Sequence, residues 1–210
     1  YILGDLFEAW VGDDDIDEPY HAELVAALRA ASDSGLQISL LHGNRDFLLG
    51  AGFAAATGIR LIGDPYILST PEWQFVLSHG DALCLDDTAY MAFRAQVRNP
   101  EWQSALLAKP LAERRAIAAH MREVSELSHR GKDSSYTDLN PTATDDFLRQ
   151  HGYATFIHGH THQPARHDHI IDGIHVERWV LADWQETRGE SLVWDGEMLS
   201  REAILPENQP

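Results

Sequence analysis

The stretch YATFIHGHTH (residues 153–162) joins a short apolar run to a turn rich in glycine and histidine. Three other stretches have the same form: YILGD (1–5), QISLLHGNRD (37–46) and WQFVLSHGD (73–81). Continuous apolar runs of this length are typical of strands covered on both faces. Helical patterns lie between them, at 21–32 and from Asn140-Pro141 to about His151. The alternation predicts an α/β domain with packed sheets.

The chain departs from this alternation in two places. Residues 86–131 read as consecutive helices interrupted by Pro100 and Pro110, and we interpret them as a helical cap inserted into one domain that spans residues 1–210. Beyond residue 165 the pattern changes to two hairpins, with expected turns at Asp172-Gly173 and Asp195-Gly196.

The composition narrows the class of protein. The formal net charge of −17 argues against nonspecific binding of nucleic acid. Residues 94–132 carry eight basic and four acidic side chains, a local net charge of +4. Cys84 is the only cysteine, so no internal disulfide can form and a reducing compartment is expected. No apolar run approaches the roughly 20 residues that a membrane-spanning helix needs, and no signal peptide is visible.

Side chains that can bind metal follow each apolar run directly. Because α/β sheets place ligands at the carboxyl ends of their strands, we expect these side chains to meet in one site. The candidate ligands are Asp5, Asn44, His79, His160 and His162. This mixture of nitrogen and oxygen donors suits Mn²⁺, Fe or Zn²⁺ better than Ca²⁺. Two such ions roughly 3.5–4 Å apart can stabilise the attacking and leaving oxygens of a displacement at phosphorus.

The remaining histidines and two aspartates have simpler interpretations. His42 and His158 lie in apolar runs and are expected to be core residues with satisfied hydrogen bonds. The others of the hairpin region, His167, His169 and His175, are expected at the surface. We expect Asp46 and Asp81 to accept hydrogen bonds from backbone groups or from the ligand imidazoles.

Four of these motifs, taken in order, carry a family resemblance. GD (4–5), GNRD (43–46), HGD (79–81) and GHTH (159–162) resemble four of the five blocks of the calcineurin-like metallophosphoesterases. The resemblance implies two packed mixed β-sheets flanked by helices. It also implies that Asp5 bridges two metal ions, that Asn44, His79 and His160 complete one site, and that His162 belongs to the other. The first block, Asp-x-His, is expected upstream of Tyr1, and without it the second metal is expected to bind poorly.

Arg45 indicates the type of bond that is cleaved. Many members of the family carry histidine at this position, which can protonate a leaving group. Arginine keeps its proton and acts as a fixed, bidentate phosphate clamp. The substitution therefore favours a phosphoanhydride substrate over a simple phosphomonoester. The alternative is that Arg45 forms an ordinary salt bridge with Asp46 or Asp87.

A closer resemblance extends over nearly the whole chain, including the helical insertion. The segments 1–15, 42–50, 78–87 and 156–165 are similar to the UDP-2,3-diacylglucosamine pyrophosphohydrolases. That family, usually with Mn²⁺, cleaves a lipid A precursor at the cytoplasmic face of the inner membrane. Attack at the α-phosphorus gives UMP and 2,3-diacylglucosamine 1-phosphate. The resemblance implies two Mn²⁺ ions, catalytic roles for Asn44, Arg45 and His160, and substrate contacts from Asn44, Arg45, Asp87, Tyr90, Ser125, His129, Lys132 and His160. His129 stands where family members often carry asparagine.

The insertion has a specific and an ordinary interpretation. In the specific interpretation, apolar residues line a tunnel for acyl chains. Basic residues attract anionic lipid headgroups, each contributing about 1 kcal/mol near the membrane surface. Together these features imply peripheral association with the membrane. The residues expected in the tunnel are Phe93, Val97, Trp102, Leu106, Leu107 and Leu111. In the ordinary one, the insertion is a cap with its own core and a solvated basic face.

Two rival functions remain open at this point. A soluble enzyme acting on a dinucleoside polyphosphate or a similar nucleotide would use the same metal ligands but would not need an apolar cap. A metal-free interaction scaffold would not need to retain the five ligands.

Overall fold

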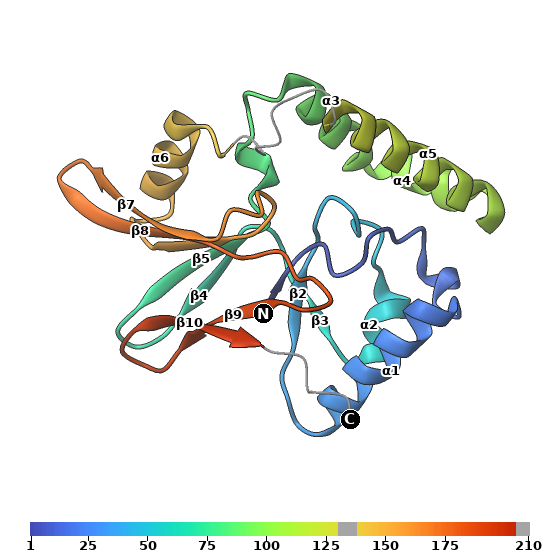
Figure 1. The fold of residues 1–210 in the computed structure, drawn as a ribbon, viewed down its shortest axis with the longest axis horizontal. Helices are drawn as coiled ribbons and strands as arrows, with labels where there is room; N and C mark the ends of the chain where they lie inside the picture. The colour runs from blue at the N-terminus through green and yellow to red at the C-terminus, as the bar shows by residue number, and fades with distance from the viewer. Residues whose placement is uncertain (130–137, 205–210) are drawn as a thin grey trace.

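The computed structural model describes residues 1–129 and 138–204 and contains two sheets and a separate hairpin (Figure 1). The first sheet is parallel, in the order β1 (Ile2–Leu3), β2 (Ser39–Leu41), β3 (Arg60–Leu61). The second runs β4 (Tyr66–Ser69), β5 (Gln74–Ser78), β6 (Thr155–His158), β8 (Ile174–Val180), β7 (Ala165–Ile171). Its three inner strands are parallel and its two outer strands antiparallel to their neighbours. The hairpin pairs β9 (Gly189–Trp194) with β10 (Leu199–Ile204).

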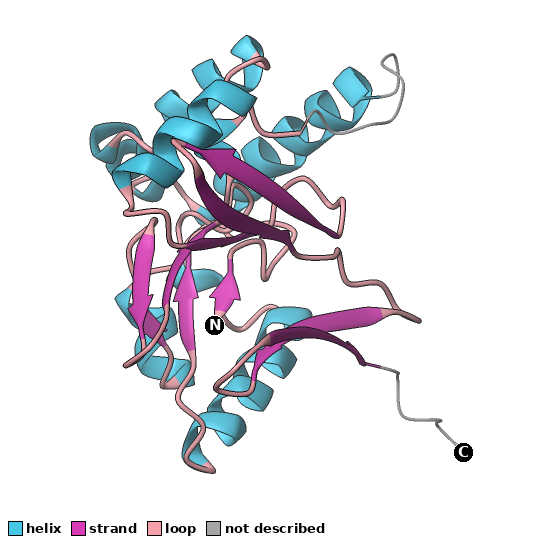
Figure 2. Ribbon diagram, turned by 90° about the vertical axis from the view of Figure 1, so that its left-hand side faces the viewer, coloured by secondary structure: helices cyan, strands magenta, loops and turns pink. Residues whose placement is uncertain are grey.

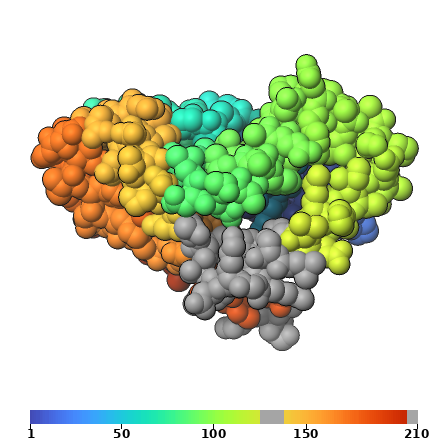
Figure 3. All heavy atoms as spheres, turned by 90° about the horizontal axis from the view of Figure 1, so that it is seen from above, coloured from blue at the N-terminus to red at the C-terminus, as the bar shows by residue number. Residues whose placement is uncertain are grey.

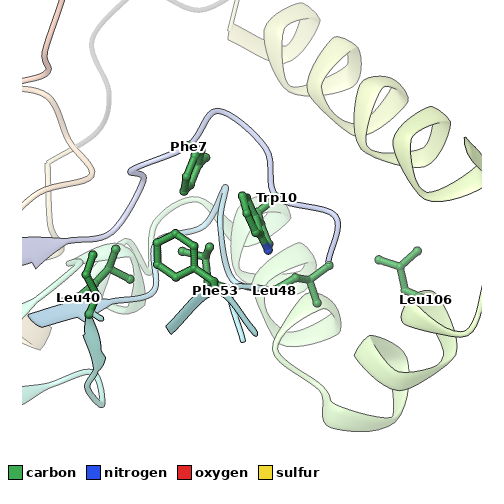
Figure 4. Close-up of a cluster of buried hydrophobic side chains, with 8 residues drawn as sticks. Phe7, Trp10, Leu40, Leu48, Phe53 and Leu106 are labelled. Carbon is green, nitrogen blue, oxygen red and sulfur yellow. The ribbon is translucent and has the colours of Figure 1, made fainter. Parts of the chain in front are cut away.

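Three hydrophobic clusters hold these layers together. The first lies between the parallel sheet and the helices α1 (Pro19–Asp33) and α2 (Ala51–Thr57). Figure 4 shows its aromatic centre, where the rings of Phe7 and Trp10 lie 5.8 and 5.4 Å from that of Phe53 in edge-on contact. The second cluster joins the two sheets through Leu41 and Phe75. The third packs α6 (Pro141–Gln150) on the mixed sheet. The order of layers, helix–sheet–sheet–helix, confirms the predicted α/β class.

Local sequence signals account for the helix ends and one hairpin turn. Asn140 begins α6, its side-chain oxygen accepting the backbone N–H of Ala143 at 3.0 Å. Between β7 and β8, Asp172 and Gly173 adopt positive φ angles of 55° and 82°. This is the geometry that a tight two-residue hairpin turn requires, as the Asp-Gly pair predicted. Short 3₁₀ helices at Asp13–Asp15 (η1) and Asp81–Leu83 (η2) complete the elements.

The segment after residue 86 forms three consecutive helices, α3 (Thr88–Val97), α4 (Pro100–Leu107) and α5 (Leu111–His129), above the carboxyl ends of the strands (Figures 1 and 2). Two arginines of α5 attach it to the loop after β1. Arg114 donates to the Val11 carbonyl oxygen and pairs with Asp14, and Arg115 pairs with Asp15. The insertion is therefore anchored by ion pairs that join residues about a hundred positions apart.

These anchors change the interpretation of the basic segment. Within the described part of residues 94–132, each lysine and arginine forms an ion pair with a carboxylate: Arg94, Arg98, Lys109, Arg114, Arg115 and Arg122. The described basic residues of the cap are thus paired, mostly with acidic side chains from the loop after β1 and with Asp81, while Lys109, Arg115 and Arg122 stay exposed to solvent. No helix in residues 1–129 and 138–204 is both long and apolar enough to cross a bilayer.

An ion pair between buried Arg178 and half-exposed Asp138 makes stability depend on pH. Arg178 donates two hydrogen bonds to Asp138, at 2.8 and 2.7 Å. Burial alone would raise the pKa of Asp138, but the bonds from Arg178 and from the Leu139 N–H outweigh it and lower the pKa to about 2. A carboxyl with a depressed folded-state pKa stabilises the protein above its ordinary pKa of 3.8, and this contribution is lost as pH falls toward 2.

Asp138→Asn should therefore lower the free energy of unfolding at neutral pH and lose its effect in acid. Urea unfolding of both proteins between neutral pH and pH 2 would measure this. Asp33→Asn serves as the control, because Asp33 pairs with Arg29 on the exposed side of α1. A difference between wild type and Asp138→Asn that stays constant with pH would contradict the assignment.

Candidate metal centre

The predicted ligands come together where the strand ends of the two sheets meet. Asn44 occupies the centre of the group: its side-chain oxygen lies 2.8 Å from Nε2 of His79 and 3.0 Å from Nδ1 of His160. Asp5 approaches from β1, with Oδ2 3.7 Å from the same His79 nitrogen. Four of the five predicted ligands are therefore adjacent.

The tautomer of His79 shows that this group suits a cation. Nδ1 of His79 lies 2.8 Å from the carbonyl oxygen of Leu3, which can only accept, so Nδ1 carries the proton. In the neutral ring, Nε2 then directs a lone pair toward the oxygens of Asn44 and Asp5. This nitrogen and the two oxygens all carry lone pairs that face one another, so they repel unless a cation lies between them. The Leu3 carbonyl thus holds His79 in the orientation that a metal ligand requires.

Asn44 is essential to this interpretation. Within the described residues, no group of three or more His, Cys, Asp or Glu side chains is arranged to hold a metal ion on its own. The amide oxygen of Asn44 is a neutral donor, and the two imidazoles are placed around it. A search for His, Cys, Asp and Glu side chains alone therefore does not find this site.

Burial keeps the second imidazole in the form that binds metal. Burial lowers the pKa of His160 to about 4. His160 is therefore neutral near pH 7, with a nitrogen lone pair available. The pKa of His162 is also lowered, first by burial and then by the charge of Arg45. Asp183 and Asp5 act on the pKa of His162 in the opposite direction and more weakly, and the assignment of His162 to a second metal stays a prediction.

The backbone is strained where the ligands attach. Five described residues other than glycine have a φ angle in the left-handed region, and three of them are predicted ligands: Asp5 (55°), His160 (64°) and His162 (54°). Each such residue costs roughly 1 kcal/mol or more. Strain of this kind persists where the surrounding structure fixes a side chain for function, and here it directs three donors toward one centre.

Two aspartates support the ligand turns, one as predicted and one differently. Asp46 is buried and accepts the N–H groups of Gly43 and Leu6, each at 2.8 Å. Burial, together with the neighbouring charge of Asp5, raises the pKa of Asp46. Asp81 accepts instead from two side chains of α3, the hydroxyl of Tyr90 and Nε of Arg94. This connection between the cap and the HGD turn was not predicted.

Arg45 lies beside the group but has different partners from those considered. It pairs with Glu8 at 2.8 Å and approaches Asp5 at 3.6 Å, so the alternative of a salt bridge with Asp46 or Asp87 is wrong in its partners. Glu8 also reaches Arg122 of α5 at 3.3 Å. The sequence reasoning missed Glu8. The sequence signal that could have indicated Glu8 is its position, three residues after Asp5 in the same loop.

The predicted substrate residues are only partly placed. Asp87 is the N-cap of α3 and accepts the N–H of Tyr90 at 3.0 Å. The ring of Tyr90 lies 5.2 Å from that of His160, at the metal group. Ser125 and His129 belong to α5, but their side chains lie outside the described part of the structure, and Lys132 lies outside the described residues.

A pocket opens beside Asn44 and Arg45, with a volume of about 260 Å³. Figure 3 shows the molecule hollowed between α3–α4 (green) and α5 (yellow-green). The apolar lining comes from both the cap and the core: Trp10, Phe47, Leu48, Phe93, Trp102, Leu106, Ile117 and Met121. Of the predicted tunnel residues, Phe93, Trp102 and Leu106 line it. Val97, Leu107 and Leu111 do not: Val97 is buried, and Leu107, one position after Leu106 on the helix, points about 100° away and is exposed.

The histidines that were not predicted as ligands lie partly where they were expected. His158 is fully buried, its Nδ1 bonded to the Gly159 carbonyl and its Nε2 accepting from Arg178, and burial lowers its pKa to about 3. His42 contacts the Leu49 carbonyl oxygen at 2.7 Å. His169 differs from expectation: it is half-buried against α6, with Nδ1 3.2 Å from Asp145, rather than at the surface.

Comparison with known proteins defines the class. A family profile described as calcineurin-like phosphoesterase matches residues 1–164. The chain belongs to the calcineurin-like phosphoesterase family, whose members hydrolyse phosphoesters with bound metal ions. Within the family, it is 51% identical over 197 residues to UDP-2,3-diacylglucosamine hydrolase of Chromobacterium violaceum, an alignment that covers 93% of this chain and 80% of the relative.

Two further relatives carry the same name. The hydrolase of Aromatoleum aromaticum is 47% identical, with 93% of this chain and 79% of the relative covered. That of Aeromonas hydrophila is 44% identical over 207 residues, with 98% and 85% covered. The similarity extends beyond the four motifs, because these alignments include the helical insertion and the hairpins after residue 165.

Proposed function

We propose that this protein hydrolyses the diphosphate of UDP-2,3-diacylglucosamine by attack of water at the α-phosphorus, giving UMP and 2,3-diacylglucosamine 1-phosphate for lipid A biosynthesis. The observation that carries the proposal is the apolar pocket that opens directly beside Asn44 and Arg45. A diacylated sugar nucleotide needs a polar metal centre and an apolar surface in contact with each other. The three relatives described above carry the name of this activity.

The residues present fit a centre of one or two Mn²⁺ ions. Asp5, Asn44, His79 and His160 would hold one ion, with Asp5 also reaching the second, to which His162 belongs. When bound, the metal supplies positive charge to the attacking and leaving oxygens at phosphorus. The cluster of lone pairs around Asn44 supports the assignment, and the nitrogen and oxygen donors favour Mn²⁺ over Ca²⁺.

Arg45 and the neighbouring residues would position the diphosphate. The guanidinium of Arg45 pairs with the carboxylate of Glu8 at 2.8 Å and lies 3.6 Å from Asp5. A phosphate of the substrate can take the place of the Glu8 carboxylate on this guanidinium. Because arginine retains its proton, Arg45 neutralises charge on the departing phosphate and does not act as the general acid. Asn44 and His160 face both the metal and this position. Asp87, Tyr90, Ser125, His129 and Lys132 are proposed contacts for the remainder of the substrate.

We assign residues 86–131 the role of a cap over the acyl chains. Phe93 and Trp102 on α3 and α4 face Ile117 on α5 across the pocket. We further propose peripheral association with the cytoplasmic face of the inner membrane. The pocket supports this more strongly than charge does, because the described basic residues of the cap are neutralised by carboxylates.

The test is to incubate the protein with Mn²⁺ and UDP-2,3-diacylglucosamine in mixed detergent micelles and to follow UMP release. Release of UMP with the diacylated sugar phosphate is expected. Hydrolysis of a dinucleoside polyphosphate without cleavage of the lipid would move the substrate to a soluble nucleotide. Absence of Mn²⁺ binding by calorimetry would remove both enzymatic assignments and favour an interaction scaffold.

Arg45→Ala should lower kcat/KM for the lipid substrate by about 100-fold, as expected for loss of a charge-assisted phosphate contact. Arg45→Lys should recover part of it, since lysine restores charge but not the planar fork. Arg29→Ala is the matched control, because Arg29 pairs with Asp33 on the exposed side of α1. Steady-state kinetics would check this, and a kcat/KM for Arg45→Ala equal to wild type would eliminate the clamp.

A further inference from the structure

One face of α3 lies against the turns that carry the metal ligands. Tyr90, Arg94 and Arg98 follow one another at intervals of four residues, so their side chains leave the helix on the same side. Each contacts a turn that carries a candidate ligand, and Tyr90 and Arg94 share Asp81 as a partner. None of the three follows a strand end, so the strand-end pattern that identifies the ligands does not include them.

Arg98 holds the turn that presents Asn44. Its Nη2 donates to the carbonyl oxygens of Gly43 at 2.9 Å and His42 at 3.2 Å, the two residues before Asn44. These are charge-assisted bonds to a turn, which has fewer backbone partners of its own than a strand or helix. Arg98 thus fixes the backbone that places the amide oxygen between His79 and His160.

Arg94 and Tyr90 hold the turn that presents His79. Asp81, two residues beyond His79, is fully buried, and its Oδ2 accepts from Nε of Arg94 at 2.9 Å and from the hydroxyl of Tyr90 at 2.8 Å. Nη2 of Arg98 lies 3.9 Å from the same oxygen. A buried carboxylate that loses its cationic partner is strongly destabilised, so these contacts fix α3 relative to the HGD turn.

The same face of α3 contacts the third turn, GHTH, through the aromatic ring of Tyr90. The ring of Tyr90 lies 5.2 Å from that of His160, at an angle of 39°. The rings of His160 and His79 are in turn 5.0 Å apart. The single face of α3 therefore meets the GNRD, HGD and GHTH turns together, and these turns carry Asn44, His79 and His160.

We propose that Arg98 is a positioning residue for the metal centre, and that the α3 face sets the spacing of the three ligand turns. Metal affinity then depends on a cap residue placed neither among the metal ligands nor among the substrate contacts. The coupling is reciprocal: metal binding stabilises α3 against local opening. The inference rests on the proposed function only in that it requires the centre to bind Mn²⁺.

The direct test is calorimetric titration of Mn²⁺ into wild type, Arg98→Met and Arg98→Lys. Arg98→Met keeps the apolar stem and removes the donors, and we expect its dissociation constant to rise about 10- to 100-fold, as for other groups that support ligands. Arg98→Lys retains one charged donor and should recover part of the affinity. Lys109→Ala is the control, because Lys109 is a cap cation whose partner among the described residues is Glu113, four positions on and away from the metal group.

The outcomes separate this inference from the proposed function. If wild type binds no Mn²⁺, the metal-dependent function fails. If wild type binds and Arg98→Met binds equally well, the positioning role is overturned. Should the variant not fold, hydrogen exchange of wild type decides: Mn²⁺ should slow amide exchange in Thr88–Val97 and leave that of α1 unchanged. Equal exchange of α3 with and without Mn²⁺ would overturn the proposal.

Discussion

Replacement of Asn44 by alanine should reduce kcat by about 1,000-fold or more while leaving the fold intact, since the loss removes stabilisation needed in the transition state. Its amide oxygen is the point at which His79 and His160 converge, at 2.8 and 3.0 Å. The side chain lies at the site and outside all three hydrophobic clusters, so its removal affects stability little. His79→Ala should act in the same direction, because His79 also faces Asp5.

The measurement combines kcat, the Mn²⁺ dissociation constant and urea unfolding for each variant. Asn140→Ala is the matched control: Asn140 caps α6, so its loss should lower stability by about 1 kcal/mol without changing turnover. Weakened Mn²⁺ binding together with lost turnover would support the ligand role. Near-normal turnover of Asn44→Ala would show that the ligand assignment is wrong.

Replacement of Gly43 by alanine should abolish metal binding and destabilise the fold, because two ligand turns approach each other at this glycine. A Cβ atom there would lie 2.1 Å from Oδ1 of Asp5 and 2.3 Å from its backbone nitrogen. This nitrogen is part of the Asp5 backbone, whose φ angle of 55° is already in the left-handed region, so moving it away costs further free energy. Overpacking of this kind costs about 1–3 kcal/mol, and it displaces the carboxylate of Asp5 as well.

Gly63→Ala provides the control, since a Cβ atom at Gly63 meets nothing within 4 Å. It should leave metal binding unchanged and alter stability by less than about 1 kcal/mol. Thermal unfolding with and without Mn²⁺ measures both effects, because a bound metal raises the melting temperature. A Gly43→Ala protein with the melting temperature and the Mn²⁺ response of wild type would contradict the close approach of the two turns.

The strand–turn motifs were readable from the sequence because their information is local. An apolar run, a glycine and a polar residue occur within about ten positions, and open sheets place such polar residues at one edge. This was sufficient to predict that Asp5, Asn44, His79 and His160 meet, and the contacts around Asn44 agree. The helix caps and the Asp172-Gly173 turn are local in the same sense. Family resemblance added the two-sheet architecture.

Short elements were missed because they carry too little local signal. β3 has two residues, β4 has four, and α2 is the seven-residue stretch AGFAAAT, which ends at Gly58 in the left-handed conformation. A strand of two residues shows no periodicity, and its pairing with β2 is a property of the neighbouring strand. Such segments become strands or helices through the layers that cover them.

Only the tertiary structure decided the partners of the charged residues. Arg45 pairs with Glu8 and not with Asp46 or Asp87, Asp81 with Arg94 of the cap, and Arg114 with an aspartate a hundred positions away. The tertiary structure also decided which cap residues face the pocket, selecting Leu106 and leaving Leu107 exposed. The sequence by itself determined the candidate ligands and their order, because each depends on its own strand and turn. The charge partners and the pocket lining depend on how distant elements pack, and local sequence does not encode these distances.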